Sequence, residues 1–120
     1  MQVYRVEHPG TRWGPYCNPF DWDSPEAENY FSVRWGLMGH HDNSNTHPRP
    51  EVSMSHEMDP DERCGFDNLD SLLAWFDQVL DALEHLGFQV VEYDVPRDYV
   101  KGPDEHGQVV FPIDRAELVC

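Results

Sequence analysis

Carboxylates recur at helical spacing in the stretch DNLDSLLAWFDQVLDALE, residues 67–84, which contains no Lys or Arg. Four of these acids, separated by steps of seven, four and three residues, are Asp70, Asp77, Asp81 and Glu84. On one continuous helix they fall within a narrow arc, about 10, 6 and 4.5 Å apart along the axis. This overlaps the spacing of duplex phosphates, about 3.4 Å along each strand. The pattern predicts either an ordinary solvated face or a surface that imitates nucleic acid to a basic protein groove.

The charge of the whole chain is lopsided, with 23 Asp and Glu against 8 Lys and Arg and a net charge of −15. Because phosphate contacts need Lys and Arg, this balance argues against direct binding of nucleic acid. We expect the partner to be a basic protein surface, such as that of a nucleic-acid-binding protein. Acids also crowd residues 57–67 and 92–105. The further partner-binding residues that we predict are Asp59, Asp61, Glu62, Asp67 and, as an anchor if its ring is exposed, Trp75.

Histidines gather in one polar segment and could in principle bind a transition metal. They are His40, His41, His47 and His56. Their spacing matches neither a helical HxxxH pair nor a zinc finger, and a flexible loop fixes ligand geometry poorly. We therefore predict no metal site, and no cofactor in the leading hypothesis.

The cysteines indicate a reducing compartment. Cys17, Cys64 and Cys120 form no CxxC pair, and Cys64 is interpreted as a packed, small apolar residue. The chain starts with a strand-like run rather than a signal peptide, and no apolar run approaches the roughly 18 residues of a membrane span. We expect an intracellular, cytoplasmic protein that does not bind membranes.

The elements that must position these residues follow from hydrophobic periodicity. We predict strands at residues 2–6, 31–35, 88–95 and 108–111 and a short terminal element at 116–119. One main amphipathic helix is expected at about 68–86, with Asp67 or Asn68 as N-cap and Gly87 as C-terminal stop. The apolar face predicted for it consists of Leu69, Leu72, Leu73, Phe76, Leu80 and Leu83.

The remaining segments complete the predicted fold. The aromatic loop that carries Trp13, Tyr16, Phe20 and Trp22 is expected to pack onto the core. Residues 39–63 are nearly without large apolar groups and are predicted to be an exposed polar excursion. The prediction is a single α+β domain, residues 1–120, with a small mixed or antiparallel sheet against one main helix.

Two segments resemble known proteins. "VYRVEHPGTRWGPY" near the start and "GFQVVEYDVPRDYVKGPDEHGQVVF" near the end are similar to small phage and prophage proteins of unknown function, with a YRxE…GPY opening and a closing QVVF strand. This resemblance implies a mobile-element origin. By its acidity the chain also resembles DNA-mimic anti-CRISPR proteins. The leading hypothesis is therefore a non-enzymatic, phage-encoded inhibitor of a host defence protein.

A second resemblance supplies the alternative hypothesis. "VYRVE" and "VPRDYVKGPDEHGQVVF" are similar to the early and late strands of the ADP-ribosyltransferase fold. The resemblance implies an NAD-binding enzyme or pseudo-enzyme in which Arg5 contacts NAD and Tyr16 or Tyr93 stacks on it. Gln108 stands where the catalytic glutamate is expected, so Glu105 or Glu7 would have to replace it. The simpler interpretation is that Arg5 is a strand residue paired with a surface acid and that Gln108 is a polar residue of an edge strand. An acidic protein with a structural role is a third possibility.

Overall fold

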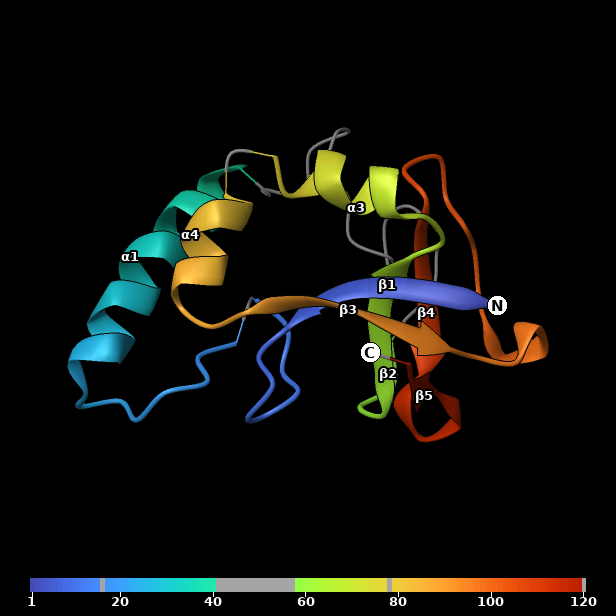
Figure 1. The fold of residues 1–120 in the computed structure, drawn as a ribbon, viewed down its shortest axis with the longest axis horizontal. Coiled ribbons are helices and arrows are strands. Elements are labelled where there is room, and N and C mark those ends of the chain that lie inside the picture. The colour runs from blue at the N-terminus through green and yellow to red at the C-terminus, as the bar shows by residue number, and fades with distance from the viewer. Residues whose placement is uncertain (16, 41–57, 78, 120) are drawn as a thin grey trace.

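Five strands form one antiparallel sheet in the computed structural model, which describes residues 1–15, 17–40, 58–77 and 79–119 (Figure 1). The strand order is β4-β2-β1-β3-β5, and every neighbouring pair is antiparallel. The strands are β1 (Gln2–Glu7), β2 (Glu62–Phe66), β3 (Gln89–Asp94), β4 (Gln108–Pro112) and β5 (Glu117–Leu118). Helices accompany this sheet, which confirms the α+β class and selects the antiparallel form.

Three of the strands, β1, β3 and β4, lie where the sequence predicts them, and β5 falls within the predicted terminal element. Strand β2 was not predicted. It lies so close to β1 that a Cβ atom on Gly65 would stand 2.5 Å from Val3 Cγ1 and 2.9 Å from the Tyr4 carbonyl oxygen. Glycine here permits close approach of the two backbones, and its weak strand propensity conceals the strand.

The strand predicted at 31–35 is wrong, because these residues belong to helix α1 (Pro25–His40). Ser24 caps this helix, since its Oγ accepts a hydrogen bond from the Ala27 N–H at 3.2 Å. Proline is compatible with the first helical position, where its missing N–H is not needed. Ala27 and Tyr30 are fully buried on one face of α1, so helical spacing prevails over the strand propensity of the aromatic residues.

The single helix predicted at 68–86 is also wrong, because it is divided into α3 (Leu69–Trp75) and α4 (Leu80–His85). Hydrogen bonds between residues three apart connect the two helices. The Asp77 N–H donates to the Ala74 carbonyl, and the Val79 N–H donates to the Phe76 carbonyl. An unbroken helix would be about 28 Å long, whereas a strand of five or six residues spans about 17–20 Å. The break lets α3 lie over the sheet while α4 lies beside α1 (Figure 1).

Both predicted ends of this segment are correct. The Asn68 side chain accepts a hydrogen bond from the Ser71 N–H at 2.8 Å and caps α3. Gly87 follows α4 with a φ of +94°. Its N–H donates to the Glu84 carbonyl, and the Phe88 N–H donates to that of Leu83, which is the Schellman arrangement.

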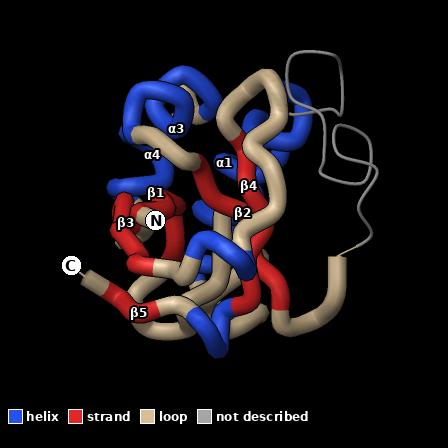
Figure 2. Tube along the Cα trace, turned by 90° about the vertical axis from the view of Figure 1, so that its right-hand side faces the viewer, coloured by secondary structure: helices blue, strands red, loops and turns tan. Residues whose placement is uncertain are grey.

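Each face of the sheet carries its own hydrophobic cluster. Figure 2 shows α3 and α4 on one side of β1 and β3, with β5 on the other side. The first cluster joins the helices to one face and includes Tyr30, Leu72, Trp75 and Leu83. The second, on the opposite face, consists of Val3, Val91, Tyr93, Val95, Val109 and Phe111. The chain thus covers one face with helices and closes the other with the segments around the short helices η1 (Arg97–Tyr99) and η2 (Ile113–Arg115).

The two ends of the predicted polar excursion, residues 39–63, overlap regular elements. Residues 39–40 belong to α1 and residues 62–63 to β2, while residues 41–57 lie outside the described part of the chain. Among the helices of the described residues, none is both long enough and apolar enough to cross a membrane.

Candidate functional site

The predicted row of acids is distributed over two helices. Asp70 lies on α3, Asp81 and Glu84 lie on α4, and Asp77 lies in the connection between them. All four are exposed, but the break after Trp75 interrupts the continuous row. Asp81 and Glu84, three residues apart on one helix, remain neighbours on the same face.

The acids before and after β2 differ in what they present to solvent. Asp59 and Asp61 are exposed. Glu62 is buried, with Oε1 accepting from the Asp59 N–H at 2.9 Å and Oε2 lying 3.8 Å from Lys101 Nζ. Half-buried Asp67 accepts from the Asn68 side-chain amide at 2.7 Å. Asp59 and Asp61 therefore fit an acidic interface better than Glu62 and Asp67 do.

Trp75 is not a surface anchor, because it is only 8% exposed. Its ring packs 5.4 Å from that of Phe66 and 6.0 Å from that of His106. Leu69 and Leu73, which were predicted on the apolar face, are exposed instead. The buried side of α3 therefore consists of Leu72 and Trp75, and not of Leu69 and Leu73.

Cations are held by the two buried glutamates. Arg5 and Arg12 form ion pairs with Glu7, and Lys101 forms one with Glu62. Within residues 1–15, 17–40, 58–77 and 79–119, no exposed carboxylate forms an ion pair with Lys or Arg. The exposed carboxylates of these ranges are Asp21, Asp23, Glu26, Glu28, Asp59, Asp61, Asp70, Asp77, Asp81, Glu84, Asp94, Asp98, Glu105, Asp114 and Glu117.

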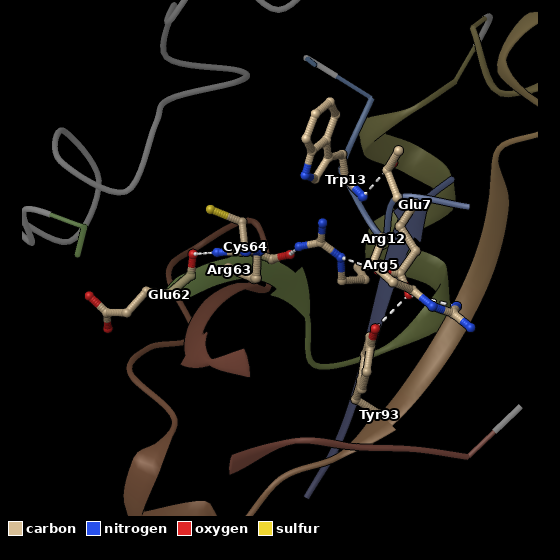
Figure 3. A network of polar contacts seen from close by, with 9 residues as sticks. Arg5, Glu7, Arg12, Trp13, Glu62, Arg63, Cys64 and Tyr93 are labelled. Atoms are coloured by element: carbon tan, nitrogen blue, oxygen red, sulfur yellow. Dashed lines mark hydrogen bonds and ion pairs between the residues drawn. The ribbon is translucent and has the colours of Figure 1, made fainter. Parts of the chain in front are cut away.

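Glu7 is the centre of a buried polar network (Figure 3). The carboxylate is 0% exposed, and its Oε1 accepts from the Tyr93 hydroxyl at 2.6 Å and from Arg12 at 3.3 Å. Its Oε2 lies 3.4 Å from Arg5 Nε, and Arg5 Nη1 donates to the Cys64 carbonyl at 2.9 Å. This network ties β1 to β2, to β3 and to the loop after β1.

Burial shifts the pKa of two groups in this network, Tyr93 and Arg5. Desolvation raises the pKa of Tyr93 to about 12, and the hydrogen bond and charge of Glu7 act in the same direction. Desolvation also lowers the pKa of Arg5, which the nearby Glu7 carboxylate opposes. Arg12, at a φ of +61°, reaches Glu7 from a loop that is closed by the His8 N–H to Trp13 carbonyl bond at 2.9 Å. The contacts of Glu7 are made by the chain itself, so we assign the network a structural role.

Of the residues in the NAD hypothesis, Arg5, Glu7 and Tyr93 meet in this network, whereas Gln108 lies on the other face of the sheet. Arg5 shares its sheet face with Val3 and Tyr93, whereas Gln108 pairs through Phe66 with Tyr4 on the opposite face. The Gln108 side chain donates to Asp104 at 3.2 Å, and exposed Glu105 forms an ion pair with His106. The simpler interpretation of Arg5 and Gln108 agrees with these contacts, except that the acid paired with Arg5 is buried.

A pocket of about 450 Å³ opens elsewhere, over the start of β1. Its lining contains neither Arg5 nor Gln108 and consists of Met1, Gln2, Tyr4, Asp67, Asn68, Leu69 and Arg97. Tyr16 lies outside the described residues, and Tyr93 is buried against Phe111 at 5.8 Å between ring centroids. Within the described residues, Arg5 and Gln108 therefore lie on opposite faces of the sheet and do not line this pocket together.

The histidines proposed as weak metal ligands fall outside the described part of the chain, apart from the backbone of His40 at the end of α1. Among the described residues, no group of three or more His, Cys, Asp or Glu side chains could hold a metal ion.

Cys64 is half-buried in β2, with its Sγ 3.3 Å from Met58 Sδ.

Exposed tryptophans are the feature that sequence analysis missed. Trp22 is 76% exposed and Trp35 84% exposed, while Phe31, one helical turn before Trp35, is half-buried and contacts the Trp22 ring in a tilted arrangement. Of the loop aromatics expected to pack on the core, Phe20 does so, whereas Trp13 and Trp22 are exposed. The spacing of Phe31 and Trp35 is a helical signal, but the strand assigned to 31–35 concealed it.

Comparison with known proteins identifies a phage protein family. The sequence profile of the family described as "Bacteriophage T4 Y00F protein" matches residues 1–120. No curated protein and no solved structure matches the chain.

Proposed function

The chain belongs to the bacteriophage T4 Y00F protein family, and on this premise we propose that it is a non-enzymatic acidic inhibitor. Its target is a basic nucleic-acid-binding surface of a host defence protein, which it occupies in place of nucleic acid, in the manner of a DNA-mimic anti-CRISPR protein. It acts in the cytoplasm of the bacterial host.

One observation carries this proposal: within the described ranges, no exposed carboxylate forms an ion pair with Lys or Arg. Arg5, Arg12 and Lys101 instead form ion pairs with the buried carboxylates of Glu7 and Glu62. A surface of this kind repels nucleic acid and attracts basic proteins. Because the attraction is screened beyond a Debye length of about 10 Å at 0.1 M salt, association should be fast and sensitive to salt.

The acids around α4 are the first part of this surface to test. Asp77, Asp81 and Glu84 are all exposed and follow one another within eight residues. Replacing all three by Lys should weaken binding more than any equal change of net charge elsewhere. The matched control is D98K/D114K/E117K, because these exposed acids lie near η1, η2 and β5, far from α4 (Figure 1).

The experiment compares what the tagged wild-type protein and both variants retain from a lysate of the phage host, under elution by a salt gradient. A retained nucleic-acid-binding protein is then purified and titrated with labelled duplex DNA, with and without the inhibitor. The proposal requires displacement of the DNA by wild-type protein and by D98K/D114K/E117K, with at least about tenfold loss for D77K/D81K/E84K. Binding that does not change with salt, or DNA that stays bound, would contradict it.

A further inference from the structure

An exposed aromatic stripe runs along the outer side of α1. It consists of Trp22, Phe31 and Trp35, to which Glu28 adds a carboxylate. Phe31 and Trp35 are four residues apart, and Glu28 precedes Trp35 by seven, so all three lie along one side of the helix. The Trp22 ring stands 5.2 Å from that of Phe31, inclined by 34°. Two large rings therefore expose their surface beside a free carboxylate.

The charge around these rings is negative. Asp21 and Asp23 flank Trp22 in the chain and are exposed, as is Glu28. The one cation of α1, Arg34, is half-buried on another side of the helix, where its charge acts on buried Tyr30. In Figure 1, α1 lies at the end of the molecule opposite to β4 and β5, with α4 beside it. Helix α4, which bears Asp81 and Glu84, is thus at the same end of the molecule as α1.

We propose that this aromatic stripe is an arginine-binding platform, which anchors the chain on arginine side chains of its basic partner. The inference rests on the proposed function and specifies the chemistry of the partner surface. A guanidinium stacks on an aromatic ring while it donates in a fork to a carboxylate, whereas a lysine ammonium is a compact, strongly hydrated point charge. The first of these contacts occurs within the chain, where the Arg115 guanidinium lies over the Tyr99 ring, 5.2 Å from its centre.

A second copy of the chain is a poorer occupant of the stripe. Two stripes facing each other would bring Asp21, Asp23 and Glu28 of one copy near the same acids of the other. Like charges in contact oppose association, and each chain carries a net charge of −15. The platform is therefore expected to leave the free protein monomeric.

The experiment titrates the full-length protein with oligoarginine and oligolysine peptides of equal length at low salt. We expect wild-type protein to bind oligoarginine about fivefold more tightly than oligolysine. Each exposed cation–π contact adds little affinity, but arginine side chains can stack on two rings, Trp22 and Trp35. W22A/W35A should abolish this preference and leave oligolysine binding unchanged. W22Y/W35Y should retain part of it, and Glu28→Gln should weaken binding of both peptides.

The matched control is Tyr99→Ala, which removes an exposed aromatic ring that Arg115 already covers. It should leave the preference for oligoarginine intact. Circular dichroism verifies that each variant is folded, which is expected since the rings of Trp22 and Trp35 are largely exposed.

The outcomes separate this inference from the proposed function. Salt-sensitive binding of both peptides with equal affinity, or a preference that survives in W22A/W35A, overturns the platform while the acidic inhibitor stands. Absence of binding to either peptide overturns both. Sedimentation of the free protein completes the test, since a dimer that W22A/W35A dissociates would show that a second copy covers the stripe, and would overturn the platform.

Discussion

Removing the buried carboxylate of Glu7 should destabilise the fold more than any other single change in the polar network. In the variant Glu7→Ala, the guanidinium of Arg5, which is almost fully buried, loses its counter-charge. The Tyr93 hydroxyl loses its 2.6 Å acceptor at the same time. Breaking a buried ion pair by removing one partner costs about 3–5 kcal/mol, because the other charge remains buried and uncompensated. That is a large part of the roughly 5–15 kcal/mol that stabilises a domain of ordinary size.

The structure also ranks the milder variants. Arg12 is 45% exposed in its contact with Glu7, so Arg12→Ala should cost only about 0.2–1 kcal/mol. Tyr93→Phe removes one hydrogen bond to a charged group and should cost about 1.5–3 kcal/mol. Glu7→Gln keeps an acceptor for Tyr93 but removes the charge that faces Arg5, and should fall between Arg12→Ala and Glu7→Ala.

Urea denaturation followed by circular dichroism measures the free energy of unfolding of each variant. Glu7→Gln provides the measurement if Glu7→Ala does not fold. The reasoning is refuted if Glu7→Ala or Glu7→Gln proves no more destabilising than Arg12→Ala. Such a result would mean that the burial of the Arg5–Glu7 pair is not what stabilises the packing of β1.

Two further predictions concern stability. Gly87→Ala should destabilise by about 1–2 kcal/mol, because a side chain at a φ of +94° is strained; Gly87→Asn should cost less, and equal costs in urea denaturation would argue against the left-handed stop. The free energy of unfolding should also fall as the pH rises from about 10 to about 12. Burial raises the pKa of both Tyr30 and Tyr93 to about 12, so the folded state holds these protons more tightly than the unfolded state, whose tyrosines titrate near 10. Denaturation at stepped alkaline pH should show a shallower fall for Tyr93→Phe, and an unchanged fall would contradict this assignment.

Local sequence patterns were sufficient for several elements. The strands β1, β3 and β4 were predictable because alternating or β-branched residues form short runs between turn residues. The cap at Asn68 and the stop at Gly87 were predictable because each depends on the chemistry of one residue and its near neighbours in the chain. The charge excess was also readable from composition alone.

Long-range packing decided the features that sequence patterns missed. The predicted helix is divided after Trp75, and Leu72 and Trp75 of α3 and Leu83 of α4 are all buried in one hydrophobic cluster. Strand β2 depends on close approach to β1, which the glycine at Gly65 permits. Periodicity identifies which residues can share a face, but it does not reveal which other element will cover that face.

Some features of the candidate site follow from the sequence alone, and others depend on tertiary packing. By itself, the sequence determined that the chain carries a large excess of carboxylates, and that few cations are available to neutralise them. Only the tertiary structure decided that Glu7 and Glu62 are buried and form ion pairs with Arg5 and Lys101, and that Trp75 is inside while Trp35 is outside. The physical reason is that charge belongs to each residue type, whereas burial depends on contacts between segments far apart in the chain.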